Sequence, residues 1–143
     1  MEVLLRIRST QRYDGEKAEK TEFLSIGTLW QEDGTLYLRY AESALTGLEG
    51  TTTTFAVEPN RIVLTRQGGL HSEMCFCLGE RHESLYNMGM GACMVSILTE
   101  KLQNHLTPIG GHFSVQYAIA VEDASIGTIT YRIDVMPRTV KNL

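Results

Sequence analysis

Residues 51–67 read TTTTFAVEPNRIVLTRQ, two strand-like runs separated by the turn signal Pro59-Asn60. The same rhythm continues on both sides between Gly34 and Gly127, where a turn signal interrupts an apolar run about every ten residues. Consecutive strands joined by tight turns most simply form an antiparallel meander, and closing that meander hides the sheet edges. The sequence therefore predicts an all-β fold, a single antiparallel up-and-down barrel of eight to ten strands.

The turn signals also set the bounds of the predicted strands. Range 92–104 leaves two alternatives open, because its apolar residues run almost continuously and Glu100, Lys101 and Leu102 are good helix formers. A strand is preferred there over a helix that plugs one barrel end. The run Thr51–Thr54 is expected to be an exposed strand because threonine has high β-propensity. The predicted strands lie at residues 2–12, 21–32, 35–43, 51–58, 61–67, 72–78, 82–88, 92–104, 111–122 and 128–136.

The composition is that of an ordinary soluble globular protein, with 43% hydrophobic and 21% charged residues in a chain of 143. This length suits one domain, residues 1–143, that buries a substantial core. The formal net charge is −4, and acidic and basic residues are interspersed. Such a balance disfavours nucleic acids and anionic membranes as partners.

The N-terminal sequence MEVLLR lacks the basic flank and long apolar core of a signal peptide, and no 18 consecutive residues are apolar. Three cysteines, an odd number with Cys75 and Cys77 two positions apart, do not form a disulfide framework. Both observations predict a cytoplasmic location.

Side chains alternate across a strand, so the apolar parity of each strand identifies its inward face. In the predicted strand 35–43, the apolar parity starts at Leu36 and Leu38 and continues into Tyr40 and Glu42. In the predicted strand 72–78, the apolar parity ends at Leu78. Two opposite charges, Glu42 and Arg66, are thereby predicted to point inward from separate strands. Tyr86 is placed inward by analogy. The predicted inward polar and aromatic set is Tyr40, Glu42, Arg66, Tyr86, Tyr117 and Tyr131.

Short motifs containing these residues follow one another in a characteristic order. They are Gly27, Tyr40-Ala-Glu42, Arg66-Gln-Gly68, His82-Glu-Ser-Leu-Tyr86 running on to Gly91, Thr99 and the Gly111 to Tyr117 strand. From about residue 3 to residue 136 the chain resembles the YwiB-like family of uncharacterised bacterial proteins.

This resemblance implies a calycin-like barrel, similar in shape to lipocalins and fatty-acid-binding proteins, in a bacterial cytoplasm. It implies no established activity and supplies no functional residues to transfer. One departure is Met88, which stands where the family pattern has a threonine, so a polar role is in doubt at that position.

Two interpretations of the inward set stay open. In the first, the barrel holds a small ligand, Arg66 orients its carboxylate or phosphate, and Glu42 positions Arg66. In the second, Glu42 and Arg66 form a buried ion pair and the tyrosines cap the barrel ends. Both interpretations require Glu42 and Arg66 to point inward, so this placement does not decide between them.

Metal binding is the main competing interpretation. His71, Glu73, Cys75 and Cys77 share one parity of a strand, with His82 and Cys93 on neighbouring segments. Two cysteines in a Cys-x-Cys strand lie roughly 6–7 Å apart, which is far for one ion with Zn–S bonds of about 2.3 Å. We therefore expect no metal and no cofactor.

No nucleophile elbow or phosphate loop accompanies the serines and glycines, so no enzymatic activity is assigned. The preferred function is binding of a small anionic or amphipathic ligand in the barrel interior. The alternative is a structural or regulatory module that binds a protein partner or a second copy of itself. For that alternative, either Leu24, Ile26 and Trp30 or Phe23 and Leu29 would form an exposed apolar set. A third hypothesis is an enzyme that uses the polar cluster.

Overall fold

The computed structural model describes residues 1–68, 71–87 and 91–138, with only the backbone described at 86–87. All ten predicted strands are present, and region 92–104 is a strand, so the helix alternative is wrong there. Position 88, the predicted end of one strand, lies outside the described residues. The strands are β1 (Glu2–Tyr13), β2 (Glu19–Glu32), β3 (Thr35–Ala41), β4 (Thr51–Glu58), β5 (Arg61–Gly68), β6 (Ser72–Cys77), β7 (Arg81–Asn87), β8 (Ala92–Thr107), β9 (Gly110–Val121) and β10 (Ala124–Pro137).

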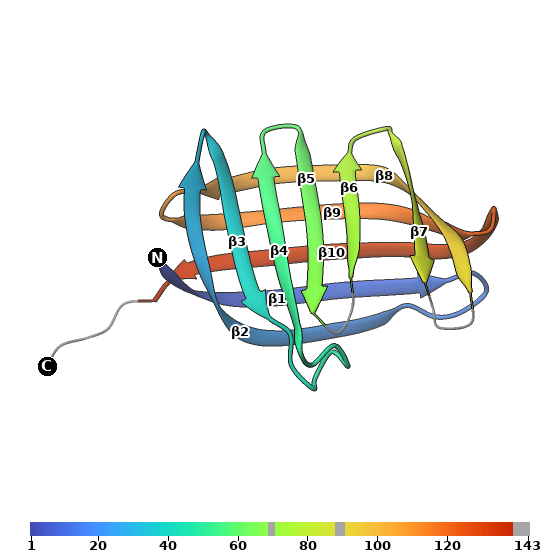
Figure 1. Ribbon diagram of the computed structural model, residues 1–143, viewed down its shortest axis with the longest axis horizontal. Coiled ribbons are helices and arrows are strands. Elements are labelled where there is room, and N and C mark those ends of the chain that lie inside the picture. Colours follow the sequence, from blue (N-terminus) through green and yellow to red (C-terminus); the bar gives the residue numbers. More distant parts are fainter. Residues whose placement is uncertain (69–70, 88–90, 139–143) are drawn as a thin grey trace, which may run out of the picture.

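The strands form one antiparallel sheet in the order β6-β5-β4-β3-β2-β1-β10-β9-β8-β7. The short strands β3 to β7 cross in front of the long strands β8, β9, β10 and β1, and β2 bends between the two layers (Figure 1). Every consecutive pair forms a ladder except β6 and β7, the two ends of the sheet among the described strands. Near this seam the Ser84 hydroxyl donates to the Glu73 carbonyl oxygen at 3.1 Å. The predicted up-and-down barrel is therefore confirmed, with closure nearly complete.

Strand β8 is long because it pairs with β7 over its first half and with β9 over most of its length. A register shift between Thr99 and Lys101 lets it bend just beyond Leu98, where the ladder with β7 ends and only the ladder with β9 continues. The bulge also explains why the apolar residues of β8 do not alternate regularly, because the parity that faces inward changes at the register shift.

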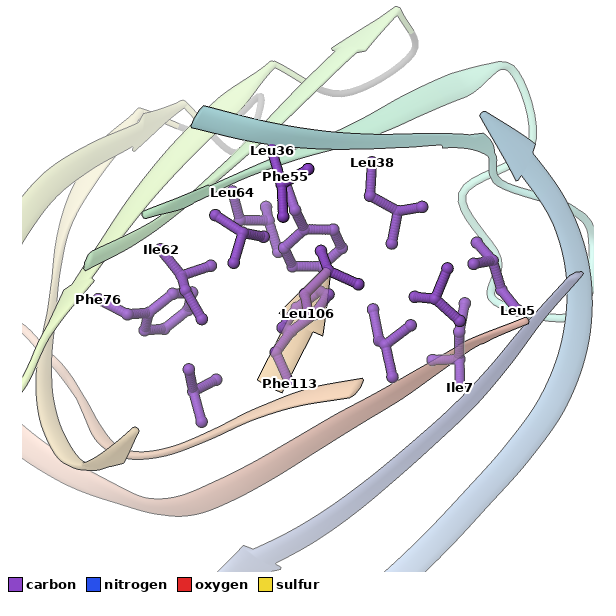
Figure 2. Close-up of a cluster of buried hydrophobic side chains, with 14 of the residues drawn as sticks. Leu5, Ile7, Leu36, Leu38, Phe55, Ile62, Leu64, Phe76, Leu106 and Phe113 are labelled. Atoms are coloured by element: carbon purple, nitrogen blue, oxygen red, sulfur yellow. The ribbon is translucent and has the colours of Figure 1, made fainter. Parts of the chain in front are cut away.

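Large apolar side chains fill the space between the two layers. Phe55 and Phe113 meet edge to face with ring centroids 5.2 Å apart, and both are almost fully buried at the centre of the cluster (Figure 2). Leu36, Leu38 and further aliphatic side chains of the same buried cluster surround them. Leu78 is an exception to the parity prediction, with 60% of its surface exposed, because β6 ends at Cys77 and the chain turns there.

The threonine run at the start of β4 corrects a second expectation. Thr51 and Thr53 are buried rather than exposed, whereas Thr52 and Thr54 lie on the outer face. The alternation continues into Phe55, so the run follows the same inward parity as the rest of the strand. Burial of two hydroxyls here makes this end of the barrel interior polar.

No helix in the described part of the chain has the length and apolar character needed to cross a membrane.

Candidate functional site

A pocket of about 240 Å³ lies at the polar end of the barrel, beneath the loop that joins β3 to β4. Its lining residue Arg66 lies on β5 in register with Thr53 on β4, which is in register with Tyr40 on β3. Tyr131 reaches the pocket from β10. The lining residues are Ser9, Gln11, Thr21, Phe23, Glu42, Leu45, Thr46, Leu48, Arg66 and Tyr131.

Glu42 follows the last residue of β3 and is fixed by its neighbours. Its backbone N–H donates to the Thr51 carbonyl oxygen at 2.8 Å, which extends the ladder by one step. Its side chain accepts the Thr53 hydroxyl at Oε1 and the Thr46 hydroxyl at Oε2, both at 2.9 Å. Only 7% of the residue is exposed, so these two hydroxyls replace much of the water around the carboxylate. The arrangement holds a negative charge at one side of the pocket.

Arg66 supplies the positive charge. Its Nε is buried and has no hydrogen-bond partner among the described residues, and the same is true of Oγ of Ser72, its register neighbour on β6. The ion pairs found in the described part of the chain do not include Glu42 with Arg66. The two residues lie on the same inner face, as predicted, but β4 separates their strands.

Two phenols complete the polar cluster. The Tyr40 and Tyr131 hydroxyl oxygens are 3.2 Å apart. Burial raises the pKa of Tyr40 far above its ordinary value, and Tyr131 and Glu42 raise it further. Burial also raises the pKa of Tyr131, against the opposing effects of the Tyr40 hydrogen bond, the Arg66 charge and a hydrogen bond with the Arg66 side chain. Both phenols therefore stay neutral at physiological pH and can donate or accept hydrogen bonds.

The apolar interior behind this cluster is almost filled. The remaining void has a volume of about 20 Å³, and Arg66 and Tyr131 stand between it and the polar pocket. Tyr117 lines this void and packs against Phe76, with ring centroids 4.9 Å apart. The predicted set is thus divided: Tyr40, Glu42, Arg66 and Tyr131 meet at the polar end, and Tyr117 lies deeper. The side chain of Tyr86 lies outside the described residues.

The residues of the metal hypothesis lie on the outside of the barrel. His71 and Glu73 are exposed, and Cys75 and Cys77 are half-buried. Burial raises the pKa of Cys75, which disfavours the thiolate form that binds metals. Within the described residues no group of three or more histidine, cysteine or acidic side chains could hold an ion.

Sequence reasoning missed the residues that hold Glu42 and complete the pocket, namely Thr53, Thr46, Ser9 and Gln11. For Thr53 the signal was present, since it has the parity of Phe55 and Val57 on β4. For Thr46 there was no such signal, because it lies in a loop whose path depends on tertiary contacts.

Comparisons with known proteins identify the fold and leave the activity open. A family model described as a domain of unknown function, DUF1934, matches residues 5–133. The crystal structure of the ywiB protein from Bacillus subtilis is similar with a TM-score of 0.73 and 20% sequence identity, over 93% of this chain and 90% of that chain. At this identity the likeness shows the fold alone. No curated protein matches the chain.

Proposed function

The chain belongs to the DUF1934 family, a domain of unknown function, and on this barrel we propose that the polar end binds a small anionic ligand through Arg66. The proposal places the protein in the cytoplasm, as the sequence predicts, of a bacterium, as the family resemblance implies. It assigns no enzymatic reaction, since the polar cluster is proposed to bind and not to transform its ligand.

The observation that carries the proposal is the buried Nε of Arg66. A buried N–H group without an acceptor costs about 1–3 kcal/mol, and more when the group is charged. Arg66 lines the pocket, so its guanidinium can meet an anionic oxygen that enters, and a small shift of the side chain would let Nε donate to that oxygen as well. Charge-assisted hydrogen bonds from a guanidinium to a carboxylate or phosphate are among the strongest in proteins. An anion therefore suits this position.

The size of the two cavities favours a compact ligand. The polar pocket of about 240 Å³ has room for a small organic acid, and Phe23, Leu45 and Leu48 give it apolar walls. The void of about 20 Å³ behind Arg66 is close to the smallest volume that holds a single water. A fatty-acid tail would need the core around Phe55 to move apart. Amphipathic ligands, which the sequence also allows, therefore fit this pocket less well than small anions do.

Isothermal titration calorimetry with acetate, butyrate, citrate and inorganic phosphate, at low salt, tests this function. At least one anion is expected to bind at one site, and Arg66→Gln is expected to weaken it about tenfold or more through loss of a charge-assisted hydrogen bond. Arg39→Gln, on the outer face, is the matched control. Absence of binding by all four anions, or equal binding by Arg66→Gln, would contradict the proposal.

A second candidate, self-association, is favoured by an apolar patch on the outer face. Leu24 and Ile26 are exposed, and the register places Leu4 between Ile26 and Met136. Trp30 offers only part of its ring to this patch, because one face of the ring stacks on Tyr37 with ring centroids 5.3 Å apart. A dimer that Ile26→Lys converts to monomer in light scattering would support this role. A monomer at high concentration would exclude it.

A further inference from the structure

We propose that the ligand of the polar pocket is zwitterionic, a small amino-acid-like molecule whose anionic group meets Arg66 and whose ammonium group meets Glu42. This inference rests on the proposed function, because it specifies the chemistry of the same ligand. It goes beyond that function in assigning a second charge and a second binding residue.

Two opposite charges face one pocket and do not pair with each other. Glu42 and Arg66 are the charged residues that line it, and the ion pairs of the described chain do not join them. A charge held in a poorly solvated place is costly unless an opposite charge or hydrogen bonds compensate it. An anion alone would compensate Arg66 but would place a second negative charge in the same pocket as Glu42, whose own charge the Thr46 and Thr53 hydroxyls offset only in part. A molecule carrying both charges compensates both.

The Glu42 carboxylate can accept a further hydrogen bond from a ligand. A carboxylate offers about four acceptor positions. The hydroxyls of Thr46 and Thr53 each take one, on different oxygens. The Tyr40 hydroxyl also interacts with the carboxylate, which leaves about one acceptor position for an ammonium group, itself a donor of three hydrogen bonds. The two hydroxyls also hold the carboxylate in place, so little side-chain freedom is lost when the ligand binds.

The strands that carry Glu42 and Arg66 set the distance between the two charges. Strands β3 and β5 flank β4, so their axes lie roughly 10 Å apart. Long side chains shorten this gap from both sides, and Tyr131 supplies a neutral hydroxyl near Arg66. The geometry points to a ligand whose charges are separated by several bonds. Phe23, Leu45 and Leu48 can cover its apolar body.

Calorimetric titrations with matched compounds test the inference: 4-aminobutyrate carries both charges, butyrate only the negative one and butylamine only the positive one. Glycine and 6-aminohexanoate vary the charge separation. We expect 4-aminobutyrate or 6-aminohexanoate to bind about tenfold more tightly than butyrate, the gain expected from one charge-assisted hydrogen bond. Glu42→Gln is expected to abolish this preference and to retain binding of butyrate. Glu49→Gln removes an exposed charge from the same loop and is expected to keep the preference.

Three other outcomes are distinguishable. Equal binding of butyrate and all three amino acids, with dependence on Arg66, would overturn the zwitterion and leave the anion-binding function standing. Binding of butylamine alone, or of none of the compounds, would overturn both.

If Glu42→Gln does not fold by circular dichroism, Glu42→Asp serves instead, because it keeps the charge and withdraws it by one methylene. An unchanged preference for 4-aminobutyrate over butyrate in Glu42→Asp would count against a direct contact.

Discussion

At the scale of single residues, the polar end of the barrel depends on Thr53. Its side chain is completely buried and donates to Glu42, while its backbone lies between Tyr40 and Arg66. Strand parity alone predicted that Glu42 and Arg66 share the inner face. It could not predict their partners, because parity gives a direction and no distance, and β4 separates the two strands.

Thr53→Val tests the importance of this hydroxyl. The substitution keeps the shape of the side chain but removes the donor to Oε1 of Glu42, so the free energy of unfolding should fall by about 1–3 kcal/mol. Urea denaturation measures the change. Thr52→Val, on the outer face of the same strand, is the control and should stay within about 0.5 kcal/mol. Equal effects of the two substitutions would show that Glu42 does not need the buried hydroxyl.

Gly27 shows a second constraint at the residue scale. A Cβ at this position would lie 2.6 Å from the Arg39 carbonyl oxygen and 3.4 Å from Cβ of Tyr40. Gly27→Ala should therefore push β3 away from β2 and destabilise the protein by about 1–3 kcal/mol, as overpacking typically does. Thermal unfolding measures this loss, with Thr28→Ala as the neighbouring control. An unchanged melting temperature would mean that the strands separate without cost.

At the scale of elements, β6 and β7 differ from the other consecutive strands because they do not pair in a ladder. The sequence predicted both strands from their turn signals and apolar residues. It gave no sign of the seam, because each strand has an ordinary pattern and the separation arises from how the whole sheet curves. The bulge in β8 was hidden for a similar reason, since it appears in sequence only as an irregular apolar run.

The seam predicts a gradient in hydrogen exchange. Amides of β6 and β7 should exchange faster than those of β9 and β10, because each strand at the seam has a ladder on one side only. Ser84→Ala removes the hydrogen bond to the Glu73 carbonyl and should increase exchange in β6 and β7 further. Ser114→Ala on β9 is the control. Uniform protection around the barrel would contradict the description of β6 and β7 as sheet ends.

At the scale of the whole molecule, the first and last strands join the two halves of the meander. Asp134 on β10 accepts hydrogen bonds from Arg8 on β1 at 2.7 Å and from Arg132 at 3.0 Å. Partial burial acts to raise the pKa of Asp134, but the hydrogen bonds and charges of both arginines outweigh it and lower the pKa below its ordinary value. The ionised carboxylate thus stabilises the contact between the chain's two ends.

This contact predicts a dependence of stability on pH. A lowered pKa in the folded state adds stability above the unfolded value near 4, and that stability is lost as the pH falls through the folded value. Asp134→Asn should reduce the free energy of unfolding by about 0.5–1 kcal/mol at pH 7, because these side chains are partly exposed. At pH 3 the difference from the natural protein should be smaller. Denaturation curves that differ equally at both pH values would contradict this assignment.

A nitrogen–proton NMR titration with 4-aminobutyrate and butyrate tests whether the polar end of the barrel is a binding site. If the pocket binds these compounds, backbone amides around it should show saturable shifts, at Gln11, Thr21, Thr46 and Arg66. Amides on the opposite hairpin, such as Asn60, should not move. Shifts confined to the outer face, or no saturable shift with either compound, would contradict the claim.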